Sequence, residues 1–228
     1  MKKLVFLLLL AAFLSGCIPA EKSEKVKAVQ NVNEVSYYPH EVGSSWEYLE
    51  DGAPLDSTPV VATVIGPTVA NSEIWIATRL LGQGLDVTWF RQYRDDGVYL
   101  LKEERPGQVF TYDPPLKELP AVGSLRLGAV WDGDVEVEIY FPDAKPEPKT
   151  ITRKLHYSYT VVDERSVTLA TGETKIFVIN FIASEINNLN TNYDLVKQET
   201  WFSPYLGEVK TEDGFILVKT NLVGLNKK

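Results

Sequence analysis

The sequence predicts an all-β, antiparallel fold, and three observations support this prediction. From residue 60 onward, short segments alternate apolar and polar side chains, the pattern of a half-buried strand. Turn signals such as Asp95-Asp96-Gly97 separate these segments at short intervals. No window longer than about ten residues repeats its apolar side chains with the 3.6-residue period of a helix. We therefore expect consecutive antiparallel strands joined by hairpins.

The clearest strand is expected over residues 85–93, where Leu85, Val87, Trp89 and Tyr93 share one face. The other expected strands span residues 60–65, 74–80, 98–101, 108–112, 135–141, 150–162, 167–169, 173–184, 199–202, 207–211 and 214–220. Turns or loops are expected at Gly66-Pro67, Gly82-Gln83-Gly84, Pro114-Pro115, 145–148 and 187–194. A hairpin turn explains Asp95-Asp96-Gly97 better than a metal-binding loop does, because Asp-Gly favours tight hairpins.

The N-terminus has the features of a secretion signal. Met1-Lys2-Lys3 is followed by an uncharged apolar run over residues 4–14. This run is about half the roughly 20 residues that a spanning helix needs. The alternative, an anchor helix that stays in place, is disfavoured because the run stops at Ser15-Gly16. We expect residues 1–16 to be removed by cleavage between Gly16 and Cys17.

The segment Leu14-Ser15-Gly16-Cys17 resembles the lipobox of bacterial lipoproteins. The resemblance implies that Cys17 carries diacylglycerol and a further acyl chain such as palmitate, which anchors the protein stably in a membrane. The protein would then lie in the cell envelope, on the extracytoplasmic side of the outer membrane if the organism has one, and otherwise of the cell membrane. Cys17 is the only cysteine, so no internal disulfide can form. Ile18, in place of Asp, gives no inner-membrane retention signal.

Composition divides the remainder into a tether and a folded domain. Residues 17–34 are rich in Glu, Lys, Ser, Gln and Asn, and we expect a flexible tether there, with a short helix as the alternative. Residues 35–228 are long enough for one β-rich domain with a sizeable core. The whole chain has 23 basic and 31 acidic residues. This acidic balance disfavours nucleic acid as a partner.

The domain shows signs of an internal duplication, with halves at about 35–117 and 118–228. Trp46 and Trp131 lie near the start of the two halves, and Thr88-Trp89-Phe90 matches Thr200-Trp201-Phe202 further along. We expect two similar meanders that bury their apolar faces together, as a curved sheet, a half-barrel or a sandwich. Extra loop in the second half is expected at 142–150 and 186–196.

Both ends of the domain resemble a family of uncharacterised, β-rich bacterial envelope proteins. The opening resemblance lies in Tyr37-Tyr38-Pro39, Val42-Gly43, Trp46 and Tyr48, and the closing one in Trp201-Phe202-Ser203-Pro204, Gly207, Val209 and Lys210. The closing motif of that family is usually W-F/Y-A-P-G-V-G-x-V-K. This chain departs from it at Ser203 and Tyr205-Leu206. The resemblance implies a half-barrel-like envelope domain and assigns no catalytic residue.

Three groups of residues are candidates for chemistry. Asp132, Asp134, Glu136 and Glu138 share one face of a strand, where a Ca²⁺ site would need them to converge. Because such positions lie about 7 Å apart, a solvated face neutralised by Arg153 or Lys154 is the better interpretation. His40 and His156 have no metal-ligand spacing, and no G-x-S-x-G elbow supports a Ser-His-Asp triad.

The third group is aromatic. The five tryptophans are expected to pack in the core, with an aromatic surface for sugars or acyl chains as the alternative; they are Trp46, Trp75, Trp89, Trp131 and Trp201. No glycine-rich loop leads into a helix, so no phosphate site is expected.

These features favour a membrane-anchored, non-enzymatic binding module whose ligand is an apolar molecule or an envelope polymer. We expect no catalytic residue, no metal and no cofactor. One alternative is a structural or assembly lipoprotein that docks an envelope protein through exposed strand edges. The other is an envelope hydrolase.

Overall fold

The computed structural model describes residues 37–70, 72–186 and 194–223. These residues form twelve strands and one short 3-10 helix, Val122–Ser124. The strands of the first half of the chain are β1 Ser45–Glu50, β2 Val60–Ala70, β3 Glu73–Gly82, β4 Leu85–Arg94, β5 Gly97–Arg105 and β6 Gln108–Pro120. Those of the second half are β7 Val130–Phe141, β8 Lys149–Leu169, β9 Gly172–Glu185, β10 Asp194–Ser203, β11 Gly207–Lys210 and β12 Phe215–Asn221.

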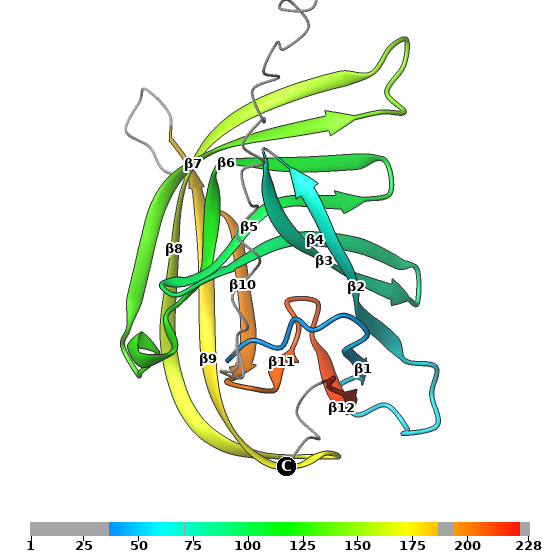
Figure 1. The fold of residues 1–228 in the computed structure, drawn as a ribbon, viewed down its shortest axis with the longest axis vertical. Helices are drawn as coiled ribbons and strands as arrows, with labels where there is room; N and C mark the ends of the chain where they lie inside the picture. Colours follow the sequence, from blue (N-terminus) through cyan, green and yellow to red (C-terminus); the bar gives the residue numbers. More distant parts are fainter. Residues whose placement is uncertain (1–36, 71, 187–193, 224–228) are drawn as a thin grey trace, which may run out of the picture. The chain divides into compact units, whose positions relative to one another are not determined.

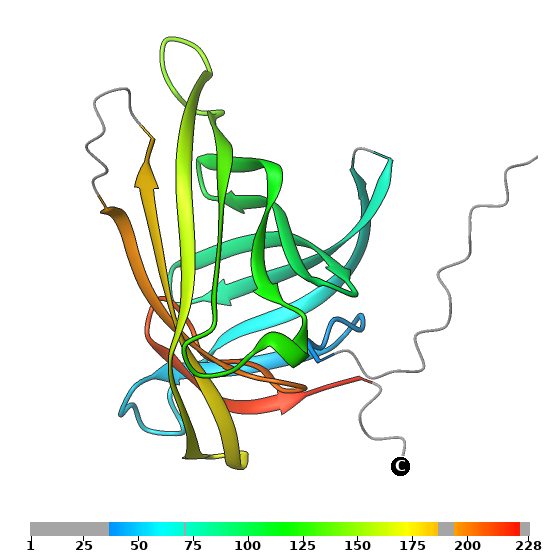
Figure 2. The same cartoon turned by 90° about the vertical axis from the view of Figure 1, so that its left-hand side faces the viewer.

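The strands form one closed antiparallel barrel (Figure 1). Each strand pairs with its neighbours in the chain, and β1 pairs with both β2 and β12. Ser45, for example, lies opposite Thr63 on one side and Asn221 on the other. The predicted all-β, antiparallel curved sheet is therefore confirmed, and its curvature continues until the first and last strands meet. Figure 2 shows β8 and β9 as a long hairpin along one side of the barrel.

Three predicted strand breaks are wrong. Gly66-Pro67 lies inside β2, and Pro114-Pro115 lies inside β6. The pairing of β2 with β3 shifts between Val64 and Gly66, a bulge that Gly66 accommodates with a φ of 135°. The pairing of β6 with β5 is interrupted where the two prolines lie, so neither has to donate a hydrogen bond to that ladder. The predicted strands 150–162 and 167–169 likewise join into β8.

The predicted hairpin at Asp95-Asp96 is present, with β4 ending at Arg94 and β5 beginning at Gly97. The landmarks of the proposed duplication fall on strands six apart in the chain. Trp46 lies in β1 and Trp131 in β7, while Trp89 lies in β4 and Trp201 in β10. The duplication itself stays a prediction. Its boundary at residues 117 and 118 falls within β6, close to the end of that strand.

The interior of the barrel holds three clusters of buried apolar side chains. The first packs around Trp46, Val60 and Leu217, and the second around Val98, Val161 and Phe202. The third contains Leu100, Leu116, Val135, Val137, Tyr157 and Ala183. Along β7, alternation buries Val135 and Val137 inside the barrel and turns the carboxylates between them outward.

Two predictions concern parts of the chain outside the described residues. They are the lipidated Cys17 with its preceding signal and following tether, and residues 187–193 of the loop predicted at 187–194; residue 194 begins β10. In the described part, no helix is long and apolar enough to span a membrane.

Candidate ligand-binding cavity

A cavity of about 420 Å³ lies inside the barrel. Its volume falls within the range of roughly 300–1,000 Å³ typical of small-molecule sites. Strands β3 to β11 all contribute to its lining. Tyr38, Leu119, Ile179 and Phe202 belong both to this lining and to the second apolar cluster, which therefore closes one side of the cavity.

One wall of the cavity is apolar and aromatic. Its side chains come mainly from β7, β8 and β9; they are Val135, Val137, Ile139, Leu155, Tyr157, Tyr159, Phe181 and Ala183. The Tyr159 ring packs against Phe181, with ring centroids 4.6 Å apart, and stacks on Trp131 at 5.3 Å. The neighbouring Tyr157 is held by a hydrogen bond of 3.2 Å, which its hydroxyl accepts from the backbone N–H of Lys117. This wall is thus a packed, preformed surface.

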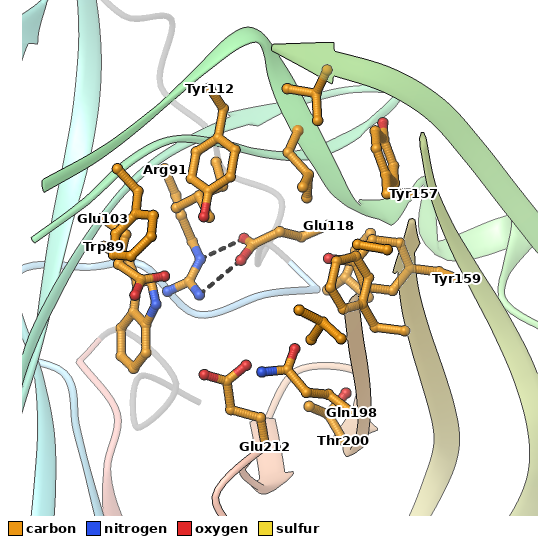
Figure 3. Close-up of a pocket in the computed structure, with 18 of the residues that line it drawn as sticks. Trp89, Arg91, Glu103, Tyr112, Glu118, Tyr157, Tyr159, Gln198, Thr200 and Glu212 are labelled. Carbon is orange, nitrogen blue, oxygen red and sulfur yellow. Dashed lines mark hydrogen bonds and ion pairs between the residues drawn. The ribbon is translucent and has the colours of Figure 1, made fainter. Parts of the chain in front are cut away.

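A buried ion pair forms part of the opposite wall (Figure 3). Arg91 of β4 donates from Nε and Nη2 to the two carboxylate oxygens of Glu118 of β6, at 2.6 and 3.0 Å. The Arg91 side chain is only 5% exposed and that of Glu118 18%, so little bulk water screens the pair. The guanidinium also lies over the Trp89 ring, 4.9 Å from its centroid. Burial alone would lower the pKa of Arg91, but Glu118 holds that pKa above its usual value.

A second charged group extends this wall. Arg105 contacts the carboxylate of Glu103 on the same strand and donates to Glu212, which follows β11, at 3.2 Å. Burial raises the pKa of Glu212 from 4.5 to about 7, and the neighbouring Glu103 adds to the effect. Burial also raises the pKa of Glu208 in β11. Both carboxyl groups therefore resist ionisation when the cavity holds no additional cation.

The residues singled out in the sequence lie mostly elsewhere. The acidic face of β7 is exposed, and Lys154 pairs with Glu136 there at 3.8 Å, as predicted. Arg153 does not neutralise this face, because it lies on the other side of β8, where it lines the cavity and pairs with Glu185 at 3.2 Å. Asp134 pairs instead with His156, at 2.7 Å.

His40 and His156 are not brought together. The His40 ring stacks on Tyr93, with centroids 4.2 Å apart, whereas His156 lies on the outer face of β8 beside Asp134. In the ranges 37–70, 72–186 and 194–223, no group of three or more His, Cys, Asp or Glu side chains could hold a metal ion.

The tryptophans differ in their environment. Trp46 and Trp75 are buried, as expected for core residues. Trp89 is half-buried; it packs against the first and third core clusters, as expected, and also lines the cavity. Trp201 is also half-buried, with Arg165 and Lys210 each 4.9 Å from its ring.

No family model, curated protein or solved structure shows significant similarity to this chain. The cavity is therefore interpreted from its own chemistry. Of its charged residues, the sequence analysis named only Arg153, and there as a neutralising partner for the acidic strand. One signal was present in the sequence, because Arg91 interrupts the apolar face formed by Val87, Trp89 and Tyr93.

Proposed function

We propose that this protein is a lipid-anchored, extracytoplasmic binding protein that holds an amphiphilic small molecule inside its barrel and performs no chemistry on it. The observation that carries the proposal is the 420 Å³ cavity, with an aromatic and aliphatic wall opposite a wall of charged side chains. Small-molecule sites combine a mostly apolar lining with a few placed polar groups in the same way.

The apolar wall would supply most of the affinity. Burying an aliphatic chain removes its surface from water, at roughly 25 cal/mol for each Å². The charged wall would set the orientation of the ligand in the cavity. An apolar group placed against buried ionic groups leaves them without polar partners, which costs free energy. Together the two walls favour a ligand with one apolar and one polar end over a purely apolar one.

The proposed docking of an envelope protein through strand edges has less support. Each of the twelve described strands is paired on both sides, so the sheet offers no complete unpaired edge to a partner strand.

Binding can be tested with the full chain carrying Cys17→Ser, which has no thiol. The neutral fluorophore N-phenyl-1-naphthylamine should bind with saturable, 1:1 stoichiometry and increased emission. Val137→Trp places an indole in the cavity and should weaken this binding at least tenfold. Glu138→Trp is the matched control, because the neighbouring side chain on β7 is exposed on the outer face, and it should leave the affinity within twofold. Equal binding by both variants would overturn the proposal.

The anchor is tested separately. In cells supplied with labelled palmitate, the wild-type chain should incorporate label and fractionate with membranes. Cys17→Ser should abolish both the labelling and the membrane fractionation, because Cys17 is the only cysteine and therefore the only acceptor thiol. Label that persists in Cys17→Ser would refute lipidation at this residue.

A further inference from the structure

The charged wall of the cavity carries more negative than positive groups. The described lining contains five carboxylates, namely Glu103, Glu118, Glu208, Glu212 and Asp213, and three guanidinium groups, namely Arg91, Arg105 and Arg153. The ion pairs already described use all three arginines: Arg91 binds Glu118, Arg105 binds Glu103 and Glu212, and Arg153 binds Glu185. Two lining carboxyl groups are left without an arginine partner, namely Glu208 and the exposed Asp213.

Glu208 is the clearest case of an uncompensated carboxylate. It lies in β11, between the buried Gly207 and Val209, and lines the cavity. Its carboxylate accepts no hydrogen bond from any described residue, although its backbone carbonyl accepts one from the Tyr48 hydroxyl at 3.1 Å. Arg91 is the cation that acts on it, but the Nε and Nη2 of Arg91 are already bound to Glu118. An enclosed carboxylate without a hydrogen-bond donor is costly unless it is neutralised.

The surroundings favour an organic cation over a metal ion. Within the described ranges the carboxylates do not converge in a group that could hold a metal. An ammonium group needs no such convergence, since it can lie between separated carboxylates and aromatic faces. Figure 3 shows aromatic rings bordering the same space, with Trp89 and Tyr112 on one side and Tyr159 on the other, and Glu212, Gln198 and Thr200 beneath.

We propose that the ligand is an amphiphilic organic cation, with its ammonium group held by Glu208 and Glu212 and its apolar part against Val137 and Tyr159. This inference rests on the proposed binding function and specifies the ligand class. Burial holds the pKa values of both carboxyl groups above their usual values, and a bound cation would counteract that effect. The arginines remain in their own ion pairs and do not contact the ligand headgroup.

The test compares three probes that share a ten-carbon chain and differ in headgroup charge: decyltrimethylammonium, decanoate and 1-decanol. Each is titrated below its micelle concentration into the full chain carrying Cys17→Ser, and heat or tryptophan emission is followed. Decyltrimethylammonium should bind at least tenfold more tightly than the other two. Val137→Trp should weaken the binding of every probe.

Two carboxyl variants locate the headgroup. Glu208→Gln, which keeps the shape of the side chain, should weaken decyltrimethylammonium at least tenfold and leave 1-decanol within twofold. Glu212→Gln provides a second test should Glu208→Gln fail to fold, and the same selective loss is expected. Glu104→Gln is the matched control, because Glu104 pairs with Lys102 at 2.8 Å and does not line the cavity.

The outcomes separate the two proposals. If 1-decanol or decanoate binds in the cavity as tightly as decyltrimethylammonium, the cation inference is wrong and the binding function stands. A Glu208→Gln chain that folds and binds the cation unchanged would also overturn the inference. If none of the probes binds in a manner sensitive to Val137→Trp, the binding function itself is refuted.

Discussion

Removing one partner of the buried Arg91–Glu118 pair should strongly destabilise the barrel. Glu118→Ala leaves the guanidinium of Arg91 inside the cavity wall, where its side chain is 5% exposed. Breaking a buried pair in this way costs about 3–5 kcal/mol. The nearby Glu208 can take over part of the pairing, so we expect a loss of about 2–4 kcal/mol in the free energy of unfolding.

The measurement is urea unfolding at pH 7, followed by tryptophan fluorescence, with the full chain carrying Cys17→Ser as the reference. The double variant Arg91→Met/Glu118→Leu removes both charges and retains side-chain volume. It should lie within about 1 kcal/mol of the reference, because apolar replacement of a buried pair is often neutral. Lys154→Ala breaks an exposed pair with Glu136 and should cost less than about 1 kcal/mol.

Two results would refute this reasoning. A loss below about 1 kcal/mol for Glu118→Ala would mean that water in the cavity solvates Arg91 as well as Glu118 does. A double variant as unstable as the single one would mean that packing, and not the unpaired charge, explains the loss.

Three further perturbations test other parts of the barrel. Gly97→Ala should lower the free energy of unfolding in urea by about 3 kcal/mol or more. The added Cβ would collide with the carbonyl oxygen of Leu119, and the φ of Gly97, 152°, is one that residues with a Cβ rarely adopt. Gly133→Ala should cost about 1–3 kcal/mol, since its Cβ would lie 2.9 Å from the Tyr157 hydroxyl. The pKa of Glu212 rises from 4.5 to about 7 on folding, so stability should be fully present below pH 4.5 and fall by up to about 3 kcal/mol as pH rises through 7. Glu212→Gln should flatten that pH dependence.

Each of these predictions has a control or a contrary outcome. Gly123→Ala is the control for the two glycine variants, because nothing lies within 4 Å of its added Cβ and its φ is not positive. A cost for Gly97→Ala no larger than for Gly123→Ala would contradict the collision with Leu119. A pH profile of Glu212→Gln that matches the reference would assign the titration to another group.

The strands of this fold were largely predictable because each is a local pattern. Alternation along residues 85–93 predicted β4, and Asp95-Asp96 predicted the hairpin that follows it. Gly66-Pro67 was misleading, because the same residues that end strands also occupy bulges within them. Whether such residues end a strand or form a bulge depends on the strand that pairs with them, and that strand is a separate segment of the chain.

The cavity was harder to predict, because its charged residues come from strands far apart in the sequence. Arg91 meets Glu118 only because β5 brings β4 and β6 onto one inner face. Glu208 and Glu212 lie on or just after a strand of four residues that carries little pattern of its own. Charged residues on otherwise apolar strand faces, Arg91 in β4 and Arg153 in β8, were the local signs of a polar interior.

The closure of the barrel through β1 and β12 has a consequence for biogenesis. The first strand finds its second neighbour only when the last strand is available, so the sheet cannot be completed while the chain is still emerging. The other strand pairs join neighbours in the chain, so this one distant pairing requires the longest loop to close and leaves a strand edge unpaired in the meantime. In a chain that is exported unfolded, one side of β1 stays unpaired until β12 has also been translocated. Because an unpaired strand edge can pair with another chain, the yield of this protein depends on how long β1 stays open as well as on the stability of the finished barrel.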